Sequence, residues 1–189
     1  LYFYKLSLYN YRSIAITYMP KAEKYMSNQG ITQQGYKIKG EDALVIVDLQ
    51  NDFCPGGTLA VPDGDKIVEL INRVIDKFPL VIATQDWHPR NHCSFKANGG
   101  IWPDHCVQET KGAELHPDLK KDSIEVYVRK SFTPDDDTYS EFDGQPDLTE
   151  LLKSRNVSRI FIAGLATDYC VLATVLDGLK KGFDVIVLT

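Results

Sequence analysis

Hydrophobic and polar positions alternate along the chain in blocks that predict strands separated by helices. From Glu41 onward, short apolar runs with the length of buried strands recur, and between them lie segments with apolar residues at helical spacing. The predicted strands are 43–47, 80–83, 125–129, 159–163 and 184–188, and the predicted helices are 65–78, 147–155 and 167–181. Strands that alternate with helices indicate a parallel sheet covered by helices on both faces.

The ends of the predicted helices carry ordinary stop and start residues. Asp147 is a good N-cap for the helix 147–155, Pro79 ends the helix 65–78, and Gly182 occupies the position after the helix 167–181 where a left-handed residue is common. The last predicted strand reaches the end of the sequence, and a parallel strand usually leads into another crossover. We therefore expect the natural protein to continue beyond Thr189.

Residues 1–40 differ from the rest in composition and charge. They are rich in Tyr, Lys, Asn and Gln, show no sustained period, and carry six Lys or Arg against one acidic residue, a balance of +5. The whole chain has a net charge of −5, so residues 41–189 carry −10. We interpret 1–40 as an N-terminal extension of uncertain origin and 41–189 as one globular domain.

Composition excludes several classes of function. Apolar residues make up 43% and charged residues 25%, as in globular proteins, and no apolar run approaches the ~18 residues of a membrane span. An acidic body disfavours binding to nucleic acid. Four cysteines without a secretory segment or a C-x-x-C pair are typical of reduced thiols, so we expect a cytoplasmic protein. From the apolar runs and the charge we expect that it binds neither membrane nor nucleic acid.

Residues with useful chemistry gather where the predicted strands end. Asp48 ends the first strand, residues 84–88 follow the second, Lys130 ends the third, and residues 164–170 follow the fourth. Because the carboxyl ends of parallel strands meet at one edge of a sheet, these segments are expected to line one ligand crevice.

Cys170 lies at the start of a predicted helix, where the helix dipole favours a thiolate. A small buried hydrophobic residue is an equally good interpretation of this cysteine taken alone. Taken alone, Asp48 is most simply a residue that starts a turn, and Lys130 a solvated lysine. Together the three form a workable set: a nucleophile, a carboxylate that moves its proton, and a cation beside that carboxylate.

Three of the four histidines fall within residues 88–105. Asp86 and His88 in a D-x-H pattern, followed by His105, supply one carboxylate and two imidazoles, a combination that suits zinc, manganese or iron(II). Hydrogen-bonded loop histidines are the alternative interpretation. His116 lies outside the cluster and is interpreted as structural.

These residues stand in motifs that resemble the nicotinamidase/pyrazinamidase branch of the isochorismatase-like cysteine hydrolases. The resemblance runs in unbroken order through residues 43–189. The matching segments are 47–57 (VDLQNDFCPGG), 86–89 (DWHP) with 92–95 (HCSF), 102–107 (WPDHCV), Lys130, 139–142 (YSEF) and 164–171 (GLATDYCV).

The resemblance implies a Rossmann-like three-layer α/β/α fold that is truncated at its C-terminus, and hydrolysis of nicotinamide, and of pyrazinamide, in NAD salvage. It assigns the nucleophile to Cys170, proton transfer to Asp48 and its partner to Lys130. The oxyanion hole would be formed by the N–H groups of Ala166 and Cys170, and the peptide before Ala166 is often cis in this family.

The resemblance also implies one divalent metal ion, zinc ahead of iron or manganese. The expected ligands are Asp86, His88 and His105, with His92 either outside the ligand set or as an extra ligand. Phe53, Trp102 and Tyr139 are expected to wall the pyridine ring, and the protein is expected to form a homo-oligomer.

Alternatives remain open at this point. The chain could be another member of the same superfamily, an isochorismatase or a carbamoyl-amine amidohydrolase. It could be a metallohydrolase in which Cys170 is structural, or a binding protein without catalysis. The complete sets Asp86/His88/His105 and Asp48/Lys130/Cys170 favour the nicotinamidase interpretation over these alternatives.

Overall fold

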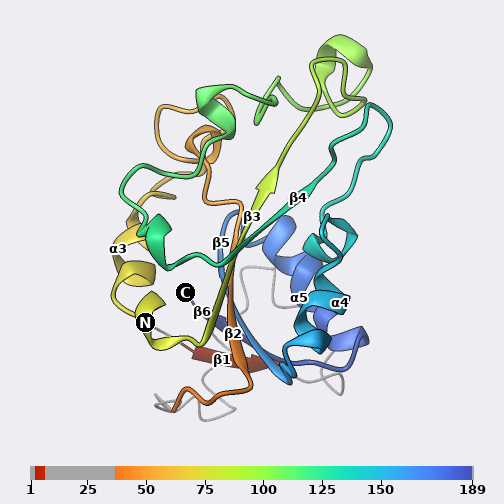
Figure 1. Ribbon diagram of the computed structural model, residues 1–189. Helices are drawn as coiled ribbons and strands as arrows, with labels where there is room; N and C mark the ends of the chain where they lie inside the picture. The colour runs from red at the N-terminus through yellow and green to blue at the C-terminus, as the bar shows by residue number, and fades with distance from the viewer. Residues whose placement is uncertain (1–2, 7–36, 189) are drawn as a thin grey trace, which may run out of the picture.

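A twisted sheet with helices on both faces forms the centre of the computed structural model, which describes residues 3–6 and 37–188 (Figure 1). Within these residues the sheet has six strands in the order β1-β6-β5-β2-β3-β4. The strands are β1 (Phe3–Leu6), β2 (Asp42–Val47), β3 (Leu80–Asp86), β4 (Val126–Lys130), β5 (Arg159–Gly164) and β6 (Asp184–Leu188). All neighbouring pairs are parallel except β1 and β6, so the predicted mostly parallel α/β sheet is confirmed.

Helices cover the two faces of the sheet unequally. The helix α3 (Lys66–Asn72) packs on one face, and α4 (Leu148–Ser154) and α5 (Cys170–Lys180) pack on the other (Figure 1). The connections within residues 37–188 contain six short 3₁₀ turns: η2 (Asn51–Phe53), η3 (Ile75–Lys77), η4 (Lys96–Asn98), η5 (Lys111–Ala113), η6 (Lys121–Ser123) and η7 (Glu141–Asp143). None of the described helices combines the length and the apolar character that crossing a membrane requires.

The core consists of two apolar clusters, one on each face of the sheet. Because successive side chains of a strand point to opposite faces, Leu44 and Ile46 of β2 enter the cluster under α3, whereas Val45 and Val47 enter the cluster under α4 and α5. Every residue of β2 is buried, as expected for a central parallel strand.

Two predicted helices are shorter in the structure. The segment 65–78 breaks after Asn72, whose side chain donates to the carbonyl of Asp118 and accepts from the N–H of Lys120. Helical periodicity contains no signal for such a distant contact. The helix predicted over 167–181 begins only at Cys170, and Gly182 follows it with φ of +90° as expected. Asp147 caps α4 by accepting from the N–H of Glu150 at 2.9 Å.

The strand β3 is three residues longer than predicted. The apolar pattern places Thr84, Gln85 and Asp86 after the strand, but they continue the parallel pairing with β4 and are buried. The hydroxyl of Thr84 donates to Asp48 at 2.9 Å, and the side-chain amide of Gln85 donates to the carbonyl of Ala113 at 2.8 Å. This extension brings the carboxylate of Asp86 to the edge of the sheet where the site forms.

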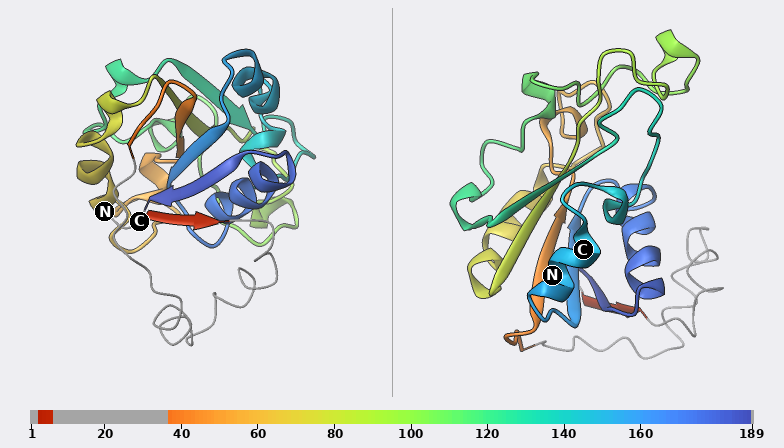
Figure 2. Two further views of the ribbon diagram at one scale, coloured as in Figure 1. Left: turned by 90° about the horizontal axis from the view of Figure 1, so that it is seen from below. Right: turned by 45° about the vertical axis from the view of Figure 1, so that its right-hand side comes forward.

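The sequence pattern does not predict β1, which pairs antiparallel with β6 at the edge of the sheet (Figure 2). Four residues are too few to produce a recognisable period. The division into an extension, residues 1–40, and a domain, residues 41–189, stays a prediction, because residues 7–36 lie outside the described part of the chain.

Candidate active site

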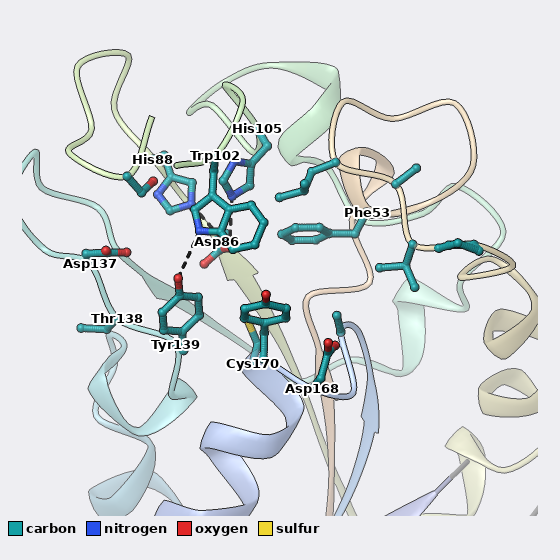
Figure 3. A pocket seen from close by; sticks show the side chains of 17 residues that line it. Phe53, Asp86, His88, Trp102, His105, Asp137, Thr138, Tyr139, Asp168 and Cys170 are labelled. Carbon is teal, nitrogen blue, oxygen red and sulfur yellow. Dashed lines mark hydrogen bonds and ion pairs between the residues drawn. The ribbon is translucent and has the colours of Figure 1, made fainter. Parts of the chain in front are cut away.

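The predicted site residues meet at the carboxyl ends of the parallel strands, around a pocket of about 250 Å³. Figure 3 shows Cys170 at the base of this pocket, with Asp86, His88 and His105 at one end and Phe53 along one side. Asp48 and Lys130 lie beneath the lining and are fully buried. The pocket is near the lower end of the sizes typical of small-molecule sites, roughly 300–1,000 Å³, and suits a substrate with a single ring.

Cys170, Asp48 and Lys130 form one contact group although they come from three separate elements. Lys130, the last residue of β4, donates from Nζ to Oδ2 of Asp48 at 2.5 Å. Asp48 follows β2 directly, and its φ of +45° turns the chain away from the sheet. A carboxylate oxygen of Asp48 lies within 4.8 Å of Sγ of Cys170. The carboxylate can therefore reach the thiol proton.

The electrostatics of the group explain why it needs all three members. Burial raises the pKa of the Cys170 thiol well above its ordinary value, and Lys130 opposes this rise only in part. The resting residue is therefore a thiol, in contrast to the thiolate that its place at a helix N-terminus suggested. Burial would lower the pKa of Lys130, but Asp48 and Asp86 raise it well above its ordinary value, so the ammonium stays charged.

The corner between β5 and α5 presents Cys170 to the pocket. Gly164 has φ of +129°, and the peptide between Leu165 and Ala166 is cis, as the resemblance implied. The carbonyl of Ala166 accepts from the N–H groups of Tyr169 and Val171, at 3.1 and 3.2 Å. The N–H groups of Ala166 and Cys170 have no acceptor in the described part of the chain. Free N–H groups beside the thiol suit an oxyanion.

Asp86, His88 and His105 offer a ligand set for a metal ion. Their donor atoms lie within 4.8 Å of one another, with Oδ2 of Asp86 3.4 Å from Nε2 of His88 and 4.0 Å from Nε2 of His105. His105 uses Nδ1 for the carbonyl of Pro103 at 2.8 Å, which leaves Nε2 as a lone-pair donor facing the group.

The state of these side chains also fits a metal. Both ring nitrogens of buried His88 lack a hydrogen-bond partner among the described residues, which is costly unless one of them binds an ion. Burial lowers the pKa of His105 and keeps the imidazole neutral, the form that binds metal. Burial opposes ionisation of Asp86, but Lys130 and His88 hold the pKa of this carboxyl well below its ordinary value.

His92 stands beside this group but has no nitrogen to spare. Its Nδ1 contacts the hydroxyl of Ser94 at 2.8 Å, and its Nε2 contacts the carbonyl of Asp136 at 3.0 Å. The ring stacks obliquely on His88, with 4.2 Å between centroids. Of the two roles expected for His92, this arrangement favours the one outside the ligand set.

Two further residues, Thr84 and Gln50, hold Asp48 and Asp86 in place by hydrogen bonds. Thr84 donates from its hydroxyl to Oδ1 of Asp48 at 2.9 Å and accepts from the N–H of Asp48 at 3.1 Å. The side-chain amide of Gln50 donates to the carbonyl of Asp86 at 2.8 Å and accepts from the N–H of Asp86 at 2.9 Å. Thr84 therefore fixes the carboxylate of Asp48, and Gln50 fixes the backbone of Asp86.

Aromatic rings wall the pocket as expected, with one addition. Phe53, Trp102 and Tyr139 all line it, and Nε1 of Trp102 donates to the hydroxyl of Tyr139 at 3.1 Å (Figure 3). Tyr169 joins them, with its ring centroid 5.3 Å from that of Trp102 and 5.8 Å from that of Tyr139. The pocket can thus hold a flat ring above Cys170.

Several features of the site have no role predicted from the sequence, among them Tyr169, the lining segment 59–62, and Glu141. Tyr169 directly precedes Cys170 in the matching motif, so its place was available as a signal. Glu141 also stands in a matching segment, between Ser140 and Phe142. An acidic residue inside that motif is the signal that could have drawn attention to it, and the structure buries both of its neighbours. The segment 59–62 carries no such signal.

Comparisons with known proteins place this geometry in a family. The model of the isochorismatase domain matches residues 42–189. The nicotinamidase of Escherichia coli (strain K12) is 45% identical over 171 residues, which cover 78% of this chain and 80% of that protein.

Two solved structures agree with this match. The pyrazinamidase of Pyrococcus horikoshii in complex with zinc is 51% identical, with a TM-score of 0.71 and coverage of 76% of this chain and 80% of that one. PnC1 from L. infantum in complex with nicotinate is 42% identical, with a TM-score of 0.76 and coverage of 79% and 80%. The chain, with its parallel sheet and its cysteine at the corner between β5 and α5, belongs to the isochorismatase-domain family.

Proposed function

We propose that this protein is a nicotinamidase, which hydrolyses nicotinamide to nicotinate and ammonia and accepts pyrazinamide as well. The observation that carries this proposal is the position of the Cys170 thiol, at the base of an aromatic pocket and within reach of the buried pair of Asp48 and Lys130. The names of its relatives support it, since they include a nicotinamidase and a structure with nicotinate bound.

In the first step Asp48 takes the proton of the Cys170 thiol, and the sulfur attacks the carboxamide carbon. A base is required because the pKa of the buried thiol is raised. The new S–C bond moves the carbonyl electron pair onto oxygen, where the N–H groups of Ala166 and Cys170 receive it. Such donors each contribute on the order of 10²–10³-fold in rate.

In the second step the tetrahedral intermediate expels ammonia and leaves a thioester. Asp48 returns its proton to the departing nitrogen, and the C–N bond breaks. Asp48 then takes a proton from water, which attacks the thioester carbon, and the thiol leaves with that proton. Lys130 remains an ammonium throughout and holds Asp48 in place for both transfers.

Asp86, His88 and His105 would hold one divalent ion, with zinc preferred because imidazole and carboxylate ligands suit it. When bound, the ion supplies a Lewis acid that orients the ring nitrogen and draws electron density from the ring. Aromatic side chains of the pocket hold the substrate ring in its plane and exclude water from the thiol. They are Phe53, Trp102, Tyr139 and Tyr169.

Release of ammonia from nicotinamide by the purified protein tests the proposal directly. Pyrazinamide, isochorismate and an N-carbamoyl amine serve as parallel substrates, because they separate the nicotinamidase from other members of the family. We expect turnover of the two aromatic amides only. Turnover of isochorismate or of the carbamoyl amine alone would overturn the proposal.

The Cys170→Ala variant separates thiol chemistry from a metallohydrolase mechanism. We expect it to retain its fold and its metal while losing turnover, because the sulfur forms the covalent intermediate. A variant that keeps a tenth of the wild-type rate would instead favour the metallohydrolase. Assembly into a homo-oligomer and a cytoplasmic location stay predictions.

A further inference from the structure

Glu141 is a buried carboxyl group that the mechanism above does not use. It is the first residue of η7 and is fully buried. Its N–H donates to the hydroxyl of Thr174 at 3.1 Å, and this hydroxyl donates to the carbonyl of Cys170 at 2.7 Å. The backbone of Glu141 is therefore fixed to the first turn of α5, on the element that carries the nucleophile.

The carboxyl group of Glu141 points into the catalytic group. Its Oε1 lies 2.9 Å from Nζ of Lys130, and one of its oxygens lies within 4.8 Å of both Sγ of Cys170 and a carboxylate oxygen of Asp48. Lys130 is therefore the donor that Oε1 faces, while Oε2 has no hydrogen-bond partner among the described residues. A buried carboxylate oxygen without a donor is costly, whereas a protonated carboxyl can itself donate.

Charge balance indicates which carboxyl group carries a proton. Nζ of Lys130 lies between three carboxyl groups, those of Asp48, Asp86 and Glu141, at 2.5, 2.6 and 2.9 Å. A divalent ion held by Asp86 would compensate that carboxylate, which leaves one ammonium between the two buried carboxyl groups of Asp48 and Glu141. Asp48 accepts hydrogen bonds from both Thr84 and Lys130, and the pKa of Asp86 is held low.

Glu141 has Lys130 alone as a donor. Burial, reinforced by Asp48, raises its pKa well above the ordinary value, and Lys130 opposes this only in part. The titratable and charged groups that face Glu141 are Asp48 after β2, Asp86 of β3, Lys130 of β4 and Cys170 of α5. The helix α4 also packs on η7, but it does so through apolar residues: Leu148 and Leu152 share a cluster with Phe142.

We propose that Glu141 is a positioning residue that remains protonated in the active enzyme and donates a hydrogen bond to the pair formed by Cys170 and Asp48, which stabilises the thiolate during attack. The acceptors for this bond are Sγ and the Asp48 carboxylate, which both lie within 4.8 Å of one Glu141 oxygen. The role deepens the proposed function and rests on it for the reaction concerned. No bond of Glu141 is made or broken, since its proton stays on the carboxyl oxygen.

The dependence on pH follows from the sign of this ionisation. Below its pKa, Glu141 is a neutral donor and favours the thiolate. When the pH rises through that pKa, Glu141 becomes a carboxylate within 4.8 Å of Sγ and raises the pKa of the thiol further. The reactivity of the wild-type thiol should therefore rise less with pH than a lone thiol would.

Two variants of similar volume test the role. Glu141→Gln keeps a donor and cannot ionise, whereas Glu141→Met has no donor. The readouts are kcat and KM for nicotinamide and, independently of turnover, the rate of alkylation of Cys170 by iodoacetamide across the pH range, followed on the Cys170 peptide by mass spectrometry. Asp143→Asn, an exposed change on the same 3₁₀ turn, is the control and should behave as the wild type.

We expect Glu141→Gln to match the wild type within about threefold at neutral pH and to exceed it at alkaline pH. Glu141→Met should lose on the order of 10–100-fold in kcat and in alkylation rate, as expected for a hydrogen bond to a charged group, with KM unchanged because Glu141 does not line the pocket.

Two results would overturn the proposal, provided that thermal unfolding shows both variants folded. Equal loss in Glu141→Gln and Glu141→Met would mean that the negative charge is what matters. Equality of Glu141→Met with the wild type would mean that Glu141 has no part in the chemistry. If the wild type did not hydrolyse nicotinamide but the alkylation order held, the substrate assignment would fail and the role of Glu141 would stand.

Discussion

Asp48 and Lys130 contact each other, yet their loss should have different consequences. Asp48 moves a proton in both halves of the proposed reaction, so Asp48→Asn should keep its fold and lose turnover by ~10²–10⁴-fold or more. Lys130→Met leaves three buried carboxyl groups without their cation, which should destabilise the fold by about 3–5 kcal/mol.

The pH–rate profiles of these two variants check the assignment. Without the ammonium, the pKa values of the carboxyl groups rise, so the ionised base appears only at higher pH and the remaining activity of Lys130→Met should shift in the alkaline direction. Chemical denaturation measures the loss of stability. If Lys130→Met were as stable as the wild type and showed no alkaline shift, lysine would act on the substrate or the thiolate instead.

His88 and His92 provide a matched test of the metal group. The two rings touch, but only His88 has nitrogens without hydrogen-bond partners. His88→Ala should therefore lose the bound metal, whereas His92→Ala should retain it with affinity weakened by no more than ~10–100-fold, the usual effect of an outer residue. Metal analysis after dialysis distinguishes them. Full occupancy in His88→Ala, or none in His92→Ala, would reassign the ligands.

At the scale of secondary-structure elements, the corner between β5 and α5 depends on Gly164. A Cβ atom on this glycine would lie 2.0 Å from the carbonyl oxygen of Val47, and its φ of +129° disfavours any side chain. Gly164→Ala should cost roughly 2–6 kcal/mol from strain and overpacking together, and should reduce kcat by displacing Ala166 and Cys170.

Gly182 is the control for this substitution. It also has a positive φ, of +90°, but a Cβ atom there would meet no atom within 4 Å. Gly182→Ala should cost only about 1–2 kcal/mol and leave kcat unchanged. Thermal unfolding and steady-state kinetics of the two variants test the difference. Equal stability losses would show that backbone strain alone accounts for both positions.

At the scale of the whole molecule, β1 can be removed to test what residues 1–25 contribute. The strand pairs with β6 at the sheet edge, whereas the site residues follow β2, β3, β4 and β5. Deletion of 1–25 should leave kcat/KM unchanged but lower the thermal midpoint and the solubility, because the backbone of β6 becomes an unpaired edge. Lys5→Pro in the full chain should show a weaker form of the same effect. A fall in kcat/KM would place these residues at the site.

Patterns of apolar residues predicted where β2 to β6 lie along the chain, and that the site residues meet at one edge of the sheet. This succeeds because burial on both faces and helical periodicity are local properties. Local patterns could not indicate that polar Thr84, Gln85 and Asp86 continue a strand, since their partners come from β2, β4 and η5.

The charge state of the site was equally inaccessible to the sequence. The motifs marked Cys170, Asp48 and Lys130, but the dipole argument favoured a thiolate, and only the three-dimensional burial raises the pKa of the thiol. Glu141 was passed over because its carboxyl reaches Lys130 through a contact between η7 and β4 that no spacing rule describes. The burial and the charge of a site are set by residues from the whole fold, which a local segment does not reveal.

The side chain of Gln50 has a consequence for the motions of the sheet. Its amide binds both the N–H and the C=O of Asp86, so it takes the place of a strand neighbour at a point where β2 has already ended. Exchange of the Asp86 amide hydrogen with solvent deuterium therefore requires its bond to Gln50 to break, and the second bond holds the Gln50 side chain in place against that opening. Although it lies next to the pocket, this amide should exchange as slowly as amides in the middle of β3, so that a ligand-binding edge behaves in exchange like the interior of the sheet.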